Sequence, residues 1–236
     1  MSLSAARRRR VFVHVLVFVS VVQAAMLRGA PRVGPPQDFV PVVKKEPVPR
    51  NGFKTWSLFL VTNQDWLVPE NAQRLWQLYN RSKAFGQVIG QEHAAVWFWK
   101  KDMPLQSPVL AENVDVERAV AYCKILGRKP SEGPYLVFTT TYPDEDAAPG
   151  AYQVITLEGK SADEISRLLL GVGDQLLMEG VVRGGTLQRP PESDDFWSAW
   201  FNATRHALGN LKSAFCFAIR TPAFNIEAGC KPAGVN

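Results

Sequence analysis

The chain has 236 residues, which is enough for one domain and an appendage. Its composition, 46% hydrophobic and 21% charged residues, excludes a disordered or fibrous protein. The formal charge of +5 comes from the first 30 residues, which hold five Arg and no acid; 22 basic and 22 acidic residues follow. A formally neutral body removes the electrostatic argument for nucleic-acid binding. Three Cys exclude a disulfide framework and a four-thiolate zinc site.

The N-terminus combines a cationic cluster with an apolar run. Arg7–Arg10 precede the apolar run 11–22, which Gln23, Ala24 and Ala25 follow; as an anchor the run would extend to Leu27. This is the pattern of a secretory signal, with cleavage after Ala24, Ala25 or Ala30. A second interpretation is an uncleaved membrane anchor. A third is a mitochondrial presequence, but presequences are amphipathic and this run is apolar on every face. We therefore expect an exported protein, at the periplasmic or extracytoplasmic face of the membrane or secreted.

Proline density and periodicity divide the chain into four segments. Residues 1–30 are predicted to be the signal peptide or anchor, and residues 31–52 a Pro-rich tether, because proline at this density favours extended chain. Residues 53–180 are predicted to form an α/β domain. Residues 181–236 are predicted to be a linker and a C-terminal helix-strand extension.

The body alternates apolar runs with segments of helical spacing. Its strands are short and almost continuously apolar, which is typical of a sheet covered on both faces. In chain order, the pattern predicts a strand over 55–62, a helix from Pro69, a strand over 94–100, a helix capped by Asp115, strands over 135–138 and 152–158, and a helix opened by a Ser161–Glu164 capping box. The predicted fold class is α/β, a mixed sheet with helices on both faces.

This β-α-β-α-β-β-α order over residues 55–178 resembles the thioredoxin fold. One local segment, 133–138, is similar to the cis-proline that enters the third strand of that family's core. The resemblance implies that Pro134 is cis and lies beside the Asn63–Pro69 loop. The family's C-x-x-C motif is missing, because residues 63–70 contain no Cys. The resemblance is therefore to a member without the thiols that disulfide exchange requires.

The same resemblance implies where a protein partner would bind. The surface lies between the Asn63–Pro69 loop and Pro134, with candidate partner-binding residues Asp65, Trp66, Gly133 and Pro134. Trp66 either anchors the partner or folds back onto its own core.

The extension contains one helix and one strand. The helix is capped by Ser193 or Asp194, the strand alternates over 214–219, and no periodic pattern follows Pro222. Neither element can bury its own apolar face, so both must dock on the main sheet or on a partner. The aromatic face available for such docking consists of Phe196, Trp197, Trp200 and Phe201.

Few side chains in the sequence are candidates for catalysis, metal binding or redox chemistry. Cys123 lies on an apolar helix stripe and is interpreted as a small buried hydrophobe, whereas Cys216 and Cys230 could form a disulfide in an oxidising compartment. His93 lacks a second ligand at metal spacing, so we expect a solvated loop residue. The acidic run 144–146 lacks the ligand order of a calcium loop. No metal, cofactor or catalytic set is predicted.

Three functions remain open from the sequence. The first is a non-catalytic, export-targeted thioredoxin-like module that binds or scaffolds a protein partner in the cell envelope. The second is a hydrolase or isomerase with a scattered site around Asp65, Glu92 and His93. The third is a subunit of a larger membrane assembly that docks through the aromatic face of the extension.

Overall fold

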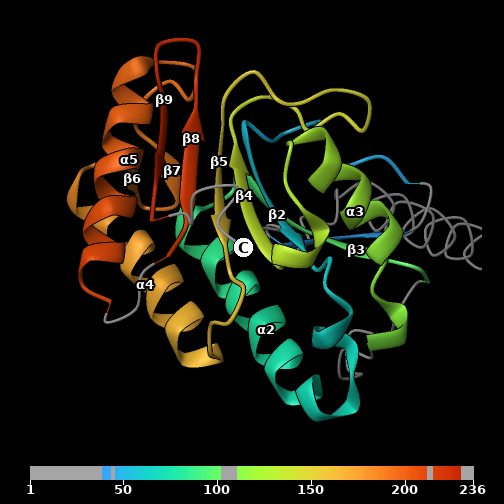
Figure 1. Ribbon diagram of the computed structural model, residues 1–236. Helices are drawn as coiled ribbons and strands as arrows, with labels where there is room; N and C mark the ends of the chain where they lie inside the picture. Colours follow the sequence, from blue (N-terminus) through green and yellow to red (C-terminus); the bar gives the residue numbers. More distant parts are fainter. Residues whose placement is uncertain (1–38, 44–45, 102–110, 212–214, 230–236) are drawn as a thin grey trace, which may run out of the picture. The chain divides into compact units, whose positions relative to one another are not determined.

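The computed structural model describes residues 39–43, 46–101, 111–211 and 215–229 (Figure 1). All of them belong to one compact unit, Gln37–Asn236. The predicted signal or anchor, with Ala24 and Ala25, lies outside the described residues, as does Cys230. Among the helices that the structure does describe, none is both long and apolar enough to cross a membrane.

A seven-stranded mixed sheet organises the unit. Its spatial order is β1-β3-β2-β4-β5-β8-β9. β3 pairs in parallel with both β1 and β2, and every other pairing is antiparallel. The strands are β1 (Phe39–Val43), β2 (Thr55–Leu60), β3 (His93–Trp99), β4 (Tyr135–Thr139), β5 (Tyr152–Thr156), β8 (Phe217–Arg220) and β9 (Asn225–Ala228). The α/β mixed sheet is therefore as predicted.

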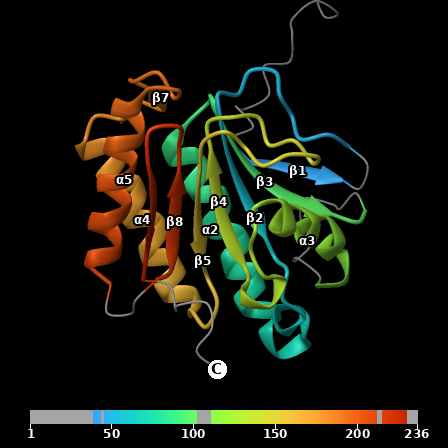
Figure 2. The same ribbon diagram turned by 45° about the horizontal axis from the view of Figure 1, so that its top comes forward.

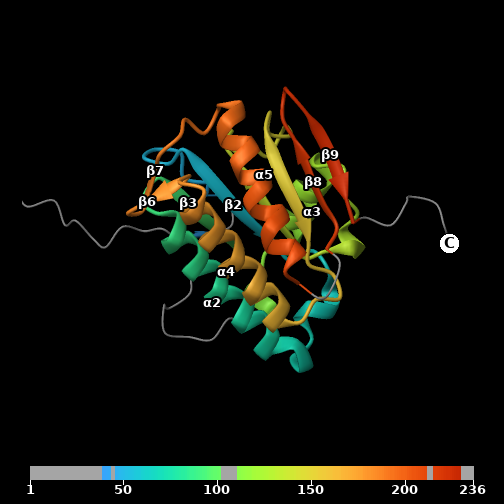
Figure 3. The same cartoon turned by 90° about the vertical axis from the view of Figure 1, so that its left-hand side faces the viewer.

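Helices cover both faces of this sheet, and Figure 3 shows three of them side by side on one face. These are α2 (Ala72–Ile89), α4 (Ala162–Met178) and α5 (Asp194–Gly209), while α3 (Val116–Ile125) packs on the opposite face. Short 3-10 turns precede them or join them to strands: η1 (Gln64–Leu67), η2 (Pro69–Asn71), η3 (Ala111–Asn113) and η4 (Pro130–Glu132). A small hairpin, β6 (Val182–Arg183) and β7 (Thr186–Leu187), forms a second sheet.

The helix ends follow the capping chemistry that the sequence predicts. Ser161 and Glu164 form a complete capping box at the start of α4. The side chain of Asp115 accepts from the Arg118 N–H at the start of α3, and Ser193 caps α5. These bonds satisfy backbone donors that would otherwise be left without partners in the first turn.

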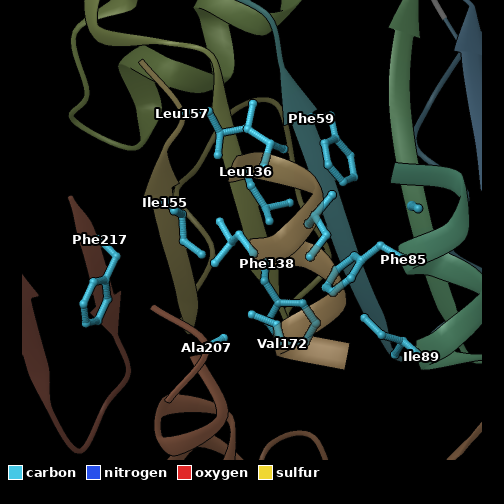
Figure 4. Packing of buried hydrophobic residues seen from close by; sticks show 14 of the residues in the cluster. Phe59, Phe85, Ile89, Leu136, Phe138, Ile155, Leu157, Val172, Ala207 and Phe217 are labelled. Atoms are coloured by element: carbon cyan, nitrogen blue, oxygen red, sulfur yellow. The ribbon is translucent and has the colours of Figure 1, made fainter. Parts of the chain in front are cut away.

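Two hydrophobic cores result, one on each face of the sheet. Strand alternation divides β3 between them: Val96 and Phe98 lie in the core under α3, and Trp97 and Trp99 lie in the core under the other three helices. Figure 4 shows side chains of the larger core converging around Phe138.

Close helix packing in the larger core depends on two glycines of α4. A Cβ on Gly173 would lie 2.9 Å from Val88 Cγ1 of α2, and one on Gly171 would lie 3.3 Å from the Ala207 Cβ of α5. These two residues therefore let α4 sit tightly between its neighbours.

The C-terminal extension docks within the same unit. β8 pairs with β5, and α5 packs against α4, so both elements bury their apolar faces in cis. Phe196, Trp197 and Trp200 are at most 1% exposed. Three of the four residues of the aromatic face that the sequence offered for docking on a membrane assembly are therefore already buried within this chain's own unit, and Phe201 is partly buried.

Three local expectations need correction. Residues 39–43 of the predicted tether form β1, which is an edge strand among the described strands, and a proline is tolerated at a sheet edge. The predicted linker contains the β6–β7 hairpin, which turns through Gly184 and Gly185 at positive φ. The tail beyond Pro222 forms β9, a four-residue strand too short for its pattern to stand out.

Candidate functional site

The loop after β2 and the turn into β4 lie side by side, as predicted. Thr62 Oγ1 donates to the Pro130 carbonyl at 2.7 Å, and Asn63 Nδ2 donates to the Ser131 carbonyl at 3.3 Å. Gly133 approaches so closely that a Cβ there would collide with Thr62 Oγ1. The Gly133–Pro134 peptide bond is cis.

This junction is closed rather than open to a partner. Trp66 is 3% exposed, with the Arg74 guanidinium 3.9 Å from its ring centroid. Gly133 and Pro134 are buried, and the Pro134 carbonyl already accepts from Leu157 N–H at 2.8 Å. Of the four candidate residues only Asp65 is exposed. Trp66 thus folds back onto its own core, because burying an indole stabilises more than exposing it.

The described cysteines are poor candidates for thiol chemistry. Cys123 is free and buried, its Sγ lies 3.1 Å from the Arg128 carbonyl, and desolvation raises the pKa of its thiol to about 11. A thiol with so high a pKa holds almost no thiolate at neutral pH. Cys216 is disulfide-bonded. Its predicted partner, Cys230, lies outside the described residues, so that pairing stays a prediction.

The structure separates the residues of the scattered enzyme site. His93 pairs with Thr55 at the beginning of β2, whereas Asp65 follows the end of that strand. The expectation that His93 is a solvated loop residue is wrong: it is the first residue of β3 and fully buried. Desolvation lowers the pKa of its imidazole to about 3, so the ring is neutral. Glu92 pairs with Lys54 at 2.7 Å.

The most developed polar contact lies on the α3 face, where the chain between β1 and β2 crosses the sheet (Figure 2). We call residues 46–50, Glu-Pro-Val-Pro-Arg, the strap. Three side chains, which we call the clamp, donate to its main-chain carbonyls. Arg118 Nη2 donates to the Glu46 carbonyl at 2.7 Å, Tyr142 Oη to the Val48 carbonyl at 2.9 Å, and Trp56 Nε1 to the Pro49 carbonyl at 2.9 Å.

The local sequence explains why the strap is extended. Pro47 and Pro49 fix their own φ near −65° and push the residues before them out of the helical region. Extended chain of this kind makes no internal hydrogen bonds, so its carbonyls are free to accept from elsewhere. The clamp supplies the donors, and Val48, 2% exposed, packs into the core under α3.

Aromatic and charged groups hold the clamp in place. Trp56 and Tyr142 meet edge to face with ring centroids 5.8 Å apart, and Arg50 of the strap stacks 4.6 Å from the Tyr142 centroid. Arg118, 8% exposed, lies 4.5 Å from the Phe98 centroid and pairs with Glu145. The clamp is thus formed by β2, α3 and the loop after β4.

An open hollow adjoins the strap at its N-terminal end. Its volume is ≈ 430 Å³, and its lining consists of Glu46, Pro47, Asp115, Glu117, Arg118, Ala121 and Glu145. Nowhere in the described ranges do three or more His, Cys, Asp or Glu side chains gather to hold a metal ion. The hollow and the clamp thus lie next to each other on the α3 face and share Arg118.

The sequence analysis missed this site. Its signal was Val48, an apolar residue between two prolines, because the burial of such a side chain requires a surface that receives it. The donors come from distant positions, and no local spacing could assign them to the strap. Comparisons with known protein families, curated proteins and solved structures found no match for this chain.

Proposed function

We propose that the protein is a non-catalytic, export-targeted module of thioredoxin-like topology that binds or scaffolds a protein partner in the cell envelope. One observation carries the binding role: the clamp holds an extended segment chiefly through its main-chain carbonyls. Main-chain recognition of extended chain is a recurrent way for proteins to bind peptides.

The connectivity supports the thioredoxin-like part of the proposal. The sequence order β2-α2-β3-α3-β4-β5-α4 joins a parallel β2–β3 pair to an antiparallel β4–β5 pair within one sheet. α2 and α4 pack on one face and α3 on the other. The Cys-free loop after β2 and the buried Cys123 thiol support a role without disulfide exchange.

Site-specific photocrosslinking of the full chain in its own cells tests the binding role. A photoreactive residue replaces Ala121, which is exposed and lines the hollow, and a matched control replaces Met178, 78% exposed on α4. We expect one discrete adduct from position 121, competed by excess unmodified protein, and none from position 178. An adduct of equal yield at both positions, or none at position 121, contradicts the proposal.

Export is tested separately by fusing residues 1–30 to a reporter. We expect the reporter on the far side of the membrane, because a cationic cluster before an apolar run stays in the cytoplasm. The size of the mature chain distinguishes a cleaved signal from a retained anchor. A reporter found entirely in the cytoplasm overturns the export proposal.

A further inference from the structure

We propose that the strap is an internal occupant of a peptide-binding groove, and that a proline-containing segment of a partner protein binds there by displacing it. The inference rests on the proposed function and names the ligand class: extended chain with an apolar residue between two prolines. The groove consists of the clamp, Trp56, Arg118 and Tyr142, and of the apolar site that receives Val48.

The contacts define what the groove selects. All three donors meet main-chain carbonyls, and none of these three bonds meets a side chain of the strap. Val48 is buried, while Glu46, Pro47 and Arg50 are exposed. A ligand must therefore be extended, keep its carbonyls available, and place one medium-sized apolar side chain between the outer hydrogen bonds. Prolines on either side of that residue satisfy the first two conditions at little entropic cost.

The strap can leave without taking the sheet with it. Its flanks are fixed independently: β1 ends at Val43 in register with Trp99, and β2 begins at Thr55 in register with His93. Between the strap and β2 stands an exposed turn at Asn51–Gly52, where Gly52 has a φ of +87°. Displacement therefore breaks the strap's own contacts and leaves both parallel pairings in place.

Covalent linkage makes the strap an efficient competitor. A segment held by short connections has an effective concentration on the order of 1 mM. We call the protein closed when the strap occupies the groove and opened when it does not. A free peptide with a Kd of about 10–100 µM for the empty groove then binds the closed protein roughly 10- to 100-fold more weakly than the opened protein. The closed form consequently responds only to ligands that exceed the strap in affinity or that are brought close by other contacts.

The test uses the full-length protein and a fluorescent peptide of residues 44–52, Lys-Lys-Glu-Pro-Val-Pro-Arg-Asn-Gly. The opened variant is Val48→Asp, which places a charge where the apolar site excludes it. A Pro47→Ala/Pro49→Ala double variant loosens the strap without adding charge and serves if Val48→Asp fails to fold. We expect the opened variants to bind the peptide at least 10-fold more tightly than wild type, and a peptide with both prolines changed to Ala to bind several-fold more weakly.

Tyr142→Phe, added to the opened variant, removes one clamp donor and should weaken peptide binding about fivefold. A folded opened variant that binds no more tightly than wild type overturns the inference, as does equal binding of the two peptides. Concentration-dependent dimers of the wild type that Val48→Asp abolishes would identify a second copy's strap as the occupant and also overturn it. Failure here with a specific adduct at position 121 leaves the proposed function intact, so the two outcomes are distinguishable.

Discussion

The two faces of the sheet differ in the partners that their buried aromatic and polar side chains find. Under α2, α4 and α5, four fully buried polar atoms have no hydrogen-bond partner among the described residues: Ser57 Oγ, His93 Nε2, Gln153 Nε2 and Trp197 Nε1. On the α3 face, the clamp donors meet carbonyls of a short segment that closes from outside. The first face holds these unsatisfied groups within dense aromatic packing, whereas on the second face Trp56 Nε1, Arg118 Nη2 and Tyr142 Oη donate to one short segment of chain.

This difference separates permanent structure from exchangeable structure. In the larger core, under α2, α4 and α5, Phe138 contacts the rings of His93, Phe196, Trp197 and Trp200. None of these rings can leave without opening a cavity. In the strap, by contrast, one buried valine and three hydrogen bonds can be lost with both flanking strands still paired. The following predictions test this contrast, beginning with the largest expected effect.

Phe138→Ala should destabilise the protein by about 3–5 kcal/mol, because it removes the ring at the centre of the larger core and leaves a cavity. Urea unfolding followed by tryptophan fluorescence measures the loss. Leu170→Ala is the control, since Leu170 is 47% exposed on α4 and should change stability by less than about 0.5 kcal/mol. Similar losses of unfolding free energy in both variants would show that the larger core is not rigidly packed.

His93 should make the larger core sensitive to acid. The pKa of its imidazole is about 3 in the folded protein and ordinarily 6.5, so the unfolded chain binds more protons between these limits. Stability from this group is full above pH 6.5 and falls with decreasing pH, by about 1.4 kcal/mol per pH unit. Unfolding measured from pH 7 to 5 should approach this slope below about pH 6, and His93→Phe should flatten it.

The matched control is His206→Gln. His206 is exposed on α5, so the substitution tests whether the slope belongs to the buried His93 in particular. A wild-type profile that stays flat between pH 7 and 5, or one that His206→Gln alters and His93→Phe does not, contradicts the assignment.

Tyr142→Phe should open the strap while leaving the fold intact. The lost hydrogen bond to the Val48 carbonyl costs about 1 kcal/mol, which is roughly a fivefold rise in the open population. Brief trypsin digestion should then cut after Arg50 about five times faster, because cleavage of a transiently open segment follows its population. Cleavage after Arg205, exposed on α5, should not change. Equal acceleration at both sites would indicate global loosening instead.

The cysteines should show the smallest effects. The buried Cys123, with a thiol pKa of about 11, should resist a thiol reagent in the native protein at pH 8 and react only on unfolding. Peptide mapping without reduction should link Cys216 to Cys230. Rapid native labelling of Cys123, or a Cys216 peptide joined to another partner, would be inconsistent with this assignment.

Sequence patterns were sufficient where local chemistry decides the structure. The Asp115 cap, the Ser161–Glu164 box and the two-sided burial of β3 all follow from neighbouring residues. The burial of His93 and Trp66 could not be read in this way, because each depends on what packs over it from a distant element. Tertiary contacts overrode the interpretation of His93 as a loop residue.

The clamp shows the same limit more clearly. Its first and last residues, Trp56 and Tyr142, are 86 positions apart in the sequence. Only the folded sheet and α3 bring these two donors and that of Arg118 to one segment. The proline pattern of residues 46–50 predicts extended chain, and the structure forms neither helix nor strand there. The same pattern could not indicate the surface that receives this segment. The sequence therefore predicted a tether without tertiary contacts, whereas in the structure the clamp binds residues 46–50.

The most direct measurement of the central claim is the indole N–H resonance of Trp56 in nitrogen-15-labelled full-length protein, assigned with Trp56→Phe. In wild type this N–H donates to the Pro49 carbonyl at 2.9 Å. We predict that the resonance moves in Val48→Asp, where the strap is released, and returns toward its wild-type position when the peptide of residues 44–52 is added. A resonance that does not move when Val48 is changed, or that moves and is not restored by the peptide, would contradict an exchangeable strap.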